Sequence, residues 1–410
     1  MCIRDRSGTP RYYGLQSRNR LRDWDDAVDG VPASRPGRIH WTGPEGPPRA
    51  SLSDVQASAT VPLFEPYAPE LEHEGAVSVF AHRWGELFPG AREAAALLRV
   101  GDHARAREVL REVLVECWAL EELFAEGRRP SMRRPIRLDV RAWSHRVDTR
   151  SDKRGWWGVE HGDRVYGDPV GRSATQAHVE RHEEILAERE AIRVAARAAA
   201  REIGDHYMVR RMVFDQETFS NLYTEGADRT PWLEAYPHAY AYEAQPSLER
   251  YDLNPYLLWS LMIVESDLNP DTVSFADAYG LLQVIPKTGE KIAMGFGEPD
   301  FGIHDLMEPS AAFRFGAWYF AELLTKFHGQ EMLAMVAYNA GPHQVQRWLD
   351  WRGEGLDLDE FIETVPYVGA RRYPQTILRY VLTYRLTYAE GTEVYVGNAL
   401  DPTYEDNIYY

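Results

Sequence analysis

Residues 254–266 of this 410-residue chain read NPYLLWSLMIVES, and the interpretation of the whole sequence begins with them. Asn254 is a good N-cap and Pro255 suits the first helical position. The stretch therefore predicts a helix that starts here and runs until Asn269-Pro270 stops it. Its apolar residues follow the i, i+4, i+7 spacing of a buried stripe, at Leu257, Leu261 and Val264.

Glu265 falls in the last turn of this predicted helix, with Leu261 and Met262 one turn below it. Burial among apolar side chains disfavours the ionised carboxylate, and the negative end of the helix dipole disfavours it again. Both effects predict a raised pKa, in the range useful for proton donation. The alternative is a solvated glutamate at a helix end, which is what most such residues are. Glu265 is thus a candidate general acid.

A second informative stretch, SFADAYGLLQVIP at residues 274–286, places one polar amide, Gln283, inside an apolar run. Gly280 permits a close backbone approach or an unusual dihedral angle, and Pro286 suits the start of another helix. These residues predict a stiff connection that holds Gln283 toward a cleft. The alternative is a core amide bonded to the backbone, since a buried amide needs partners.

Together, these two stretches resemble the catalytic motif of soluble lytic transglycosylases, the peptidoglycan-cleaving relatives of goose-type lysozyme. Two downstream pieces match in the same order. AYNAG at residues 337–341 resembles the family's Ala-Tyr-Asn motif, and FIETVPY at residues 361–367, with Tyr373, resembles its Glu-Thr-Ile-Pro segment. Each piece is short, but their order and spacing over residues 245–390 make the resemblance specific.

The resemblance implies roles for individual residues. Glu265 would be the catalytic acid and base. The implied substrate-binding or site-holding residues are Ser266, Ser274, Gln283, Ile285, Tyr338, Asn339, Glu363 and Tyr373. Asn339 also has a structural interpretation, because it ends a helix ahead of Gly341-Pro342. The chain departs from the family at Leu282 and Ile285, where methionine is common, and this departure concerns affinity for the sugar.

Most glycosidases use two carboxylates, and this sequence offers no convincing second one. Asp267, Asp271 and Asp277 lie in a segment where turn formation is the commoner role of aspartate. Glu363 is a better candidate, although the resemblance gives it a binding role. With one acid, the substrate must supply the nucleophile.

The resemblance implies cleavage of the bond between N-acetylmuramic acid and N-acetylglucosamine, with a 1,6-anhydromuramoyl product and neither metal nor organic cofactor. Two alternatives remain: a muramidase that recruits water, and a non-catalytic scaffold that binds glycan or protein.

The predicted fold is all-α, with a lysozyme-like catalytic domain preceded by part of an α-superhelical, tetratricopeptide-like repeat domain. The turn spelling Gly-Asp-His recurs at residues 101–103 and 204–206, each time between helical stretches. Residues 9–16 and 232–237 resemble a repeat phrase and the junction to the catalytic domain in large family members.

The expected domains are a non-native start at 1–7, a superhelical region at 8–244, a catalytic domain at 245–400 and a tail at 401–410. Within the superhelical region we expect a Pro/Gly-rich loop at 30–69 and a basic loop at 128–175.

Charge and composition limit the remaining options. Residues 128–154 gather nine arginines, but the formal net charge of −17 argues against a nucleic-acid partner. No apolar run is long enough to span a bilayer. The two cysteines are too few for a disulfide framework, and Cys117 reads as a small buried residue. The expected partner is peptidoglycan, and any protein partner is open. The beginning carries no signal segment, so a periplasmic or cell-envelope location is inferred from the substrate and an incomplete N-terminus is suspected.

Overall fold

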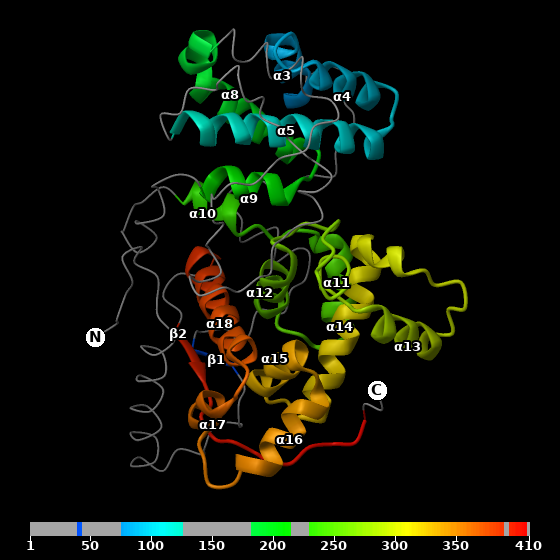
Figure 1. Ribbon diagram of the computed structural model, residues 1–410, viewed down its shortest axis with the longest axis vertical. Helices are drawn as coiled ribbons and strands as arrows, with labels where there is room; N and C mark the ends of the chain where they lie inside the picture. Colours follow the sequence, from blue (N-terminus) through cyan, green and yellow to red (C-terminus); the bar gives the residue numbers. More distant parts are fainter. Residues whose placement is uncertain (1–38, 43–74, 126–181, 215–228, 389–392, 408–410) are drawn as a thin grey trace. The chain divides into compact units, whose positions relative to one another are not determined.

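The computed structural model describes residues 39–42, 75–125, 182–214, 229–388 and 393–407 (Figure 1). The chain divides into two compact units, one of residues 63–217 and one of residues 1–62 and 218–410. The described residues are helical apart from one two-stranded sheet, which confirms the all-α class. Among its described residues, the second unit includes residues 229–244, which precede the catalytic domain expected from residue 245.

The unit of residues 63–217 contains five described helices: α3 (Ala76–Trp84), α4 (Pro89–Arg99), α5 (His103–Ala125), α8 (His182–Glu202) and α9 (His206–Phe214). Gly101 separates α4 from α5, and Gly204 separates α8 from α9, each with a positive φ that suits glycine. Both Gly-Asp-His turns therefore lie between helices, as predicted. Cys117 is buried in the core of this unit, also as predicted.

The other unit holds the candidate site. Its helices, in chain order, are α10 (Thr230–Ala235), α11 (Ala241–Tyr251), α12 (Pro255–Ser266), α13 (Pro286–Phe296), the short 3-10 helix η2 (Ile303–Met307), α14 (Pro309–Lys326), α15 (Glu331–Ala340), α16 (Pro342–Arg352), α17 (Leu358–Thr364) and α18 (Val368–Tyr388).

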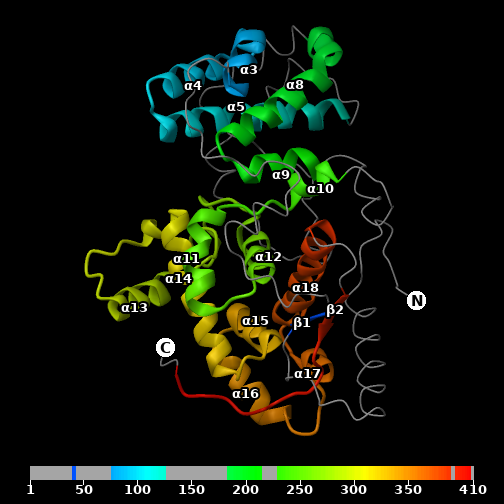
Figure 2. The same cartoon turned by 180° about the vertical axis from the view of Figure 1, so that it is seen from behind.

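The central helix of this unit is α12. Asn254 caps it through its side chain, which accepts hydrogen bonds from the amides of Tyr256 (3.1 Å) and Leu257 (3.4 Å). Both views place α12 between α11 and α18 (Figures 1 and 2). Every residue from Pro255 to Val264 is buried, so the predicted stripe was too narrow: this helix is apolar all round because protein surrounds it.

The segment before α11 is clamped between α12 and α18 by aromatic side chains. Trp259 of α12 donates a hydrogen bond to the Ala239 carbonyl (2.9 Å), and Tyr384 of α18 donates one to the Pro237 carbonyl (3.0 Å). The His238 ring lies between Trp259 and Tyr388, with centroid distances of 4.4 and 3.9 Å. This packing fixes α12 against α18, which carry Glu265 and Tyr373.

The two-stranded sheet corrects one prediction. Strand β1 (Ile39–Thr42) pairs antiparallel with β2 (Glu393–Val396), so residues 39–42 are not the loop that the Pro/Gly content of 30–69 predicted. Composition describes the average of a segment and misses a short strand whose partner is distant in sequence. The rest of that loop, residues 9–16, the basic loop 128–175 and Cys2 lie outside the described residues.

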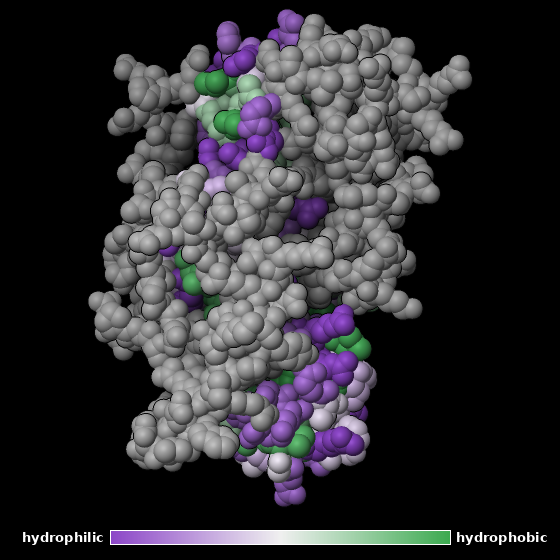
Figure 3. Space-filling view, turned by 90° about the vertical axis from the view of Figure 1, so that its left-hand side faces the viewer, coloured by the Kyte–Doolittle hydropathy of each residue, from purple (hydrophilic) through white to green (hydrophobic). Residues whose placement is uncertain are grey.

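On the face shown in Figure 3, hydrophilic residues predominate among the coloured atoms, with apolar residues scattered between them. No helix among the described residues has the length and apolarity that a membrane span requires.

Candidate active site

Glu265 lies on the last turn of α12, as predicted, but the helix ends sooner than Asn269-Pro270. Asp267 (φ 53°) and Leu268 (φ 70°) both adopt the left-handed conformation and turn the chain away from the helix axis. This conformation is uncommon for a leucine, and the side chain of Leu268 is fully buried, which holds the turn in place. The backbone after Glu265 is therefore fixed by packing.

The Glu265 carboxyl is half-buried and accepts a hydrogen bond from the hydroxyl of Tyr373, which α18 contributes. Burial raises the pKa of Glu265 to about 7, while the Tyr373 hydrogen bond acts in the opposite direction. Tyr373 is 1% exposed. Tyr373 therefore acts as a hydrogen-bond partner of Glu265, because a side chain so enclosed has little surface that a glycan could contact.

Tyr338 approaches the same carboxyl from α15. Its hydroxyl donates a hydrogen bond to the Leu282 carbonyl (2.6 Å), and its ring lies 5.5 Å from that of Tyr319. Burial raises the pKa of Tyr338 well above its usual value, and the charge of Glu265 raises it further. Tyr338 and Tyr373 therefore both stay protonated beside Glu265, as neutral hydrogen-bond donors.

The connection from α12 to α13 is built around Gln283 and Gly280. The Gln283 amide nitrogen donates to the carbonyls of Thr272 (2.9 Å) and Gly280 (2.8 Å), while its oxygen is buried and finds no partner among the described residues. Gly280 has a φ of 76°, and a Cβ there would collide with the Leu306 carbonyl. The stiff connection predicted from the sequence is present. The Gln283 side chain, however, takes the alternative role of an amide bonded to backbone.

The two serines assigned to the site hold the backbone instead. Ser266 is fully buried and donates to the Met262 carbonyl (3.0 Å), so in this structure it cannot touch a substrate. The Ser274 hydroxyl accepts from the amides of Ala276 (3.3 Å) and Ala278 (3.0 Å), which closes the turn of the connection. Small hydroxyl residues serve both roles, which is why the sequence did not separate them.

Three of the assigned residues are open to solvent. Ile285 is 44% exposed at the start of α13, and Asn339 is exposed on the last turn of α15. Glu363 is exposed on α17, where its carboxylate accepts a hydrogen bond from Gln375 (3.0 Å). These three side chains are accessible to a ligand, whereas Tyr373, Ser266 and the Gln283 amide are committed inside the protein.

The sequence analysis missed the direct contact between Tyr373 and Glu265, because the two residues are far apart in the chain and no local pattern joins them. It also missed the left-handed turn at Asp267 and Leu268, since neither residue type signals it strongly. Among the described residues, no cluster of three or more His, Cys, Asp or Glu side chains is arranged to hold a metal ion.

Alongside this arrangement of one half-buried carboxyl with a tyrosine hydroxyl bonded to it, residues 244–359 match a family model, Transglycosylase SLT domain. Residues 244–359 are therefore similar to a transglycosylase SLT domain. Soluble lytic murein transglycosylases of Salmonella typhimurium and Escherichia coli are 34% and 30% identical over 122 residues. That alignment covers 30% of this chain and 19% of each relative, so the chain spans a small part of their length.

The chain is also weakly similar to a solved structure. The crystal structure of the 70 kDa soluble lytic transglycosylase of Escherichia coli is 18% identical, covers 74% of this chain and 46% of its own, and has a TM-score of 0.40. A similarity this weak does not support any statement about this chain from that structure. The placement of Glu265, Tyr338 and Tyr373 therefore stands on the contacts described above.

Proposed function

We propose that this protein is a peptidoglycan lytic transglycosylase in which Glu265 is both the acid and the base. The observation that carries the proposal is the half-buried Glu265 carboxyl, bonded to Tyr373, with its pKa raised to about 7. A carboxyl with this pKa holds a proton near neutral pH and releases it readily, as a general acid must. The SLT domain match supports peptidoglycan as the substrate class.

In the proposed reaction, protonated Glu265 donates its proton to the oxygen that bridges N-acetylmuramic acid and N-acetylglucosamine. The C1–O bond of the muramic acid breaks, and the C6 hydroxyl oxygen of the same sugar forms a bond to C1, with help from the neighbouring acetamido group. Glu265 then accepts the proton of that hydroxyl. The product is a 1,6-anhydromuramoyl end, no water is consumed, and the acid is restored.

The need for only one carboxyl is supported by the surroundings of Glu265. Its pKa is shifted by burial and by Tyr373, and no second carboxylate of the described residues is among the groups that shift it. Two carboxylates that share a glycosidic bond lie close enough to interact, at about 5–9 Å in most families. Glu363 instead bonds to Gln375 on the protein surface, which fits a part in binding the glycan.

Tyr373 would balance the two protonation states of Glu265. The Tyr373 hydroxyl stabilises the carboxylate that forms after proton donation, while burial favours the neutral acid before it. Because the two effects oppose each other, neither state is trapped. The exposed Ile285, Asn339 and Glu363 are the residues that we assign to glycan contact.

The test is digestion of purified peptidoglycan sacculi, followed by mass measurement of the released fragments. The proposal predicts muropeptides lighter by one water than the products of a muramidase, and none released by Glu265→Gln. Fragments with a free reducing end would overturn the ring-closing step and leave a hydrolase. Unchanged release by Glu265→Gln would remove Glu265 from the chemistry. Sacculi that bind the protein but stay intact would identify a glycan-binding scaffold.

A further inference from the structure

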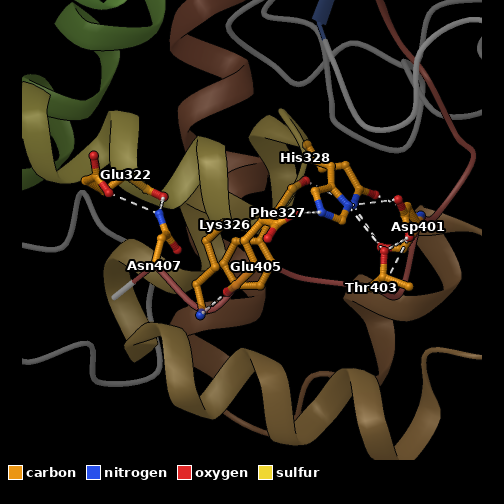
Figure 4. A network of polar contacts seen from close by, with 9 residues as sticks. Glu322, Lys326, Phe327, His328, Asp401, Thr403, Glu405 and Asn407 are labelled. Carbon is orange, nitrogen blue, oxygen red and sulfur yellow. Dashed lines mark hydrogen bonds and ion pairs between the residues drawn. The ribbon is translucent and has the colours of Figure 1, made fainter. Parts of the chain in front are cut away.

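The segment that follows β2 contacts four helices of the unit that holds the candidate site, α14, α15, α16 and α17. Residues 398–405, here called the strap, run in extended form past the ends of α14, α15 and α17, and Figure 4 shows their contacts with the end of α14. The SLT match ends at residue 359, so the strap lies outside the matched domain. Residues 401–405 of the strap belong to the tail expected from residue 401, and they are bonded to the helices.

One end of the strap caps α17. The Asn398 backbone carbonyl accepts from the amide of Leu358 (2.8 Å), and its side-chain oxygen accepts from the amide of Asp359 (3.3 Å). These are first-turn amides of α17, which have no partner inside the helix. Asn398 is 5% exposed, so it serves as a cap that a distant segment supplies. The helix that it caps carries Glu363.

Asp401, in the middle of the strap, holds the start of α15. Gln330, the N-cap residue of α15, is fully buried and bonds to the Asp401 backbone in both directions. Its amide nitrogen donates to the Asp401 carbonyl (2.8 Å), and its oxygen accepts from the Asp401 amide (3.0 Å). Loss of such bonds would leave buried polar groups unsatisfied. The helix that Gln330 begins carries Tyr338.

Further contacts fix the strap to the end of α14. Lys326 donates to the Glu405 carbonyl (2.6 Å) and its own carbonyl accepts from the Glu405 amide (2.8 Å). The His328 ring lies between the carboxylates of Asp401 (3.0 Å) and Glu405 (3.2 Å). Both pairs are partly exposed, so the buried bonds of Gln330 and Lys326 contribute more to holding the strap.

The geometry points to a positioning role, which rests on the proposed function. Two residues, Ala399 and Leu400, separate Asn398 from Asp401, so the strap spans at most about 10 Å between its contact with the start of α17 and its contact with the start of α15. We propose that the strap sets the spacing between Glu363 and Tyr338, and that Asn398 and Gln330 are its positioning residues. Small displacements of such groups cost catalytic rate even when no contact with the substrate is lost.

The test compares Gln330→Ala and Asn398→Ala with Asn407→Ala. Asn407 lies beyond the strap and bonds to Glu322 in the body of α14 (2.9 Å to its carbonyl), so it matches Asn398 in type without touching α15 or α17. We expect kcat on isolated glycan strands to fall roughly fivefold in the first two variants and to stay unchanged in the third. Asn398→Asp retains the side-chain acceptor and is expected to restore the rate.

Hydrogen exchange of the intact protein supplies a readout that needs no activity. Because the strap joins the two helices, Gln330→Ala is expected to speed exchange at the first amides of α17 by about fivefold, although it removes a contact only at α15. Unchanged exchange in α17 would overturn the coupling, whether or not the protein cleaves glycan. If Gln330→Ala speeds exchange in α17 as expected but the wild-type protein releases no fragments, the proposed function alone is refuted. If Asn407→Ala loses as much kcat as Gln330→Ala and Asn398→Ala, the strap only stabilises the fold in general and does not position Glu363 and Tyr338.

Discussion

At the scale of single residues, the site depends on the balance of two opposing effects on one carboxyl. Burial holds the pKa of Glu265 near 7, and the Tyr373 hydroxyl keeps it from rising further. The sequence predicted the first effect, because the apolar run of α12 and the helix end are local. It could not predict the second, because Tyr373 reaches Glu265 through the packing of α18 on α12.

The Tyr373→Phe variant tests this balance. Glu265 must be protonated to act as the acid, so wild-type activity is expected to fall as pH rises through about 7. Removal of the tyrosine hydroxyl takes away the group that favours the carboxylate, so this alkaline limb should move up by about one pH unit while kcat falls. The measurement is a pH–kcat profile. Tyr384→Phe, which removes a buried hydroxyl of the same helix that bonds to Pro237, should leave the limb in place.

The pH dependence of the stability of Glu265→Gln tests the raised pKa of Glu265 without any substrate. The folded pKa of Glu265 lies above its unfolded value of 4.5, so its contribution to stability is full below pH 4.5 and is lost as pH rises through about 7. The amide variant does not ionise. Melting curves should therefore show Glu265→Gln more stable than wild type at pH 8, with the difference shrinking toward pH 5. A difference that is the same at both pH values would mean that Glu265 is not shifted.

At the scale of elements, the sequence predicted best what is encoded within a few residues. The Asn254 cap, the start of α13 at Pro286 and the two glycine turns all follow from local chemistry. The end of α12 was predicted late, because the left-handed turn at Leu268 depends on its burial in the core. The roles of Ser266 and Gln283 were not resolved for a similar reason: a polar residue next to an acid can face either the ligand or the backbone.

The connection between α12 and α13 should tolerate little change at Gly280. An alanine there would need a positive φ and would drive its methyl group into the Leu306 carbonyl, so Gly280→Ala should lower the free energy of unfolding by more than about 1 kcal/mol. Urea titration measures this loss. Gly295, inside α13, has open space around it, and Gly295→Ala should stabilise the protein by roughly 0.5–1 kcal/mol. Equal effects at both positions would contradict the crowding at Gly280.

At the scale of the whole molecule, acid should destabilise the unit that holds Glu265, through His238. Its ring is enclosed by aromatic side chains, its two nitrogens find no hydrogen-bond partner among the described residues, and burial lowers its pKa to about 3. The folded state therefore resists protonation, and stability falls as pH drops below the unfolded value of 6.5. Nothing in the sequence around His238 indicated this, because the aromatic rings come from α12 and α18.

The His238→Phe variant isolates this effect. Phenylalanine fits a stack of aromatic rings and removes the titration, so stability at pH 8 should change little. Between pH 6.5 and pH 5 the wild type should lose about 2 kcal/mol that the variant keeps. Guanidinium titrations of both proteins at the two pH values give the comparison. If both lose stability in parallel, another group carries the acid sensitivity.

The pairing of β1 with β2 bears on how the chain assembles during synthesis. Strand Ile39–Thr42 is synthesised before residues 43–392, and its partner Glu393–Val396 only after them. The compact unit of residues 63–217 lies between them in the chain and can condense while β1 still waits. The edge of β1 therefore stays unpaired until residues 393–396 have been synthesised, and an unpaired edge of this kind is a site that chaperones can protect.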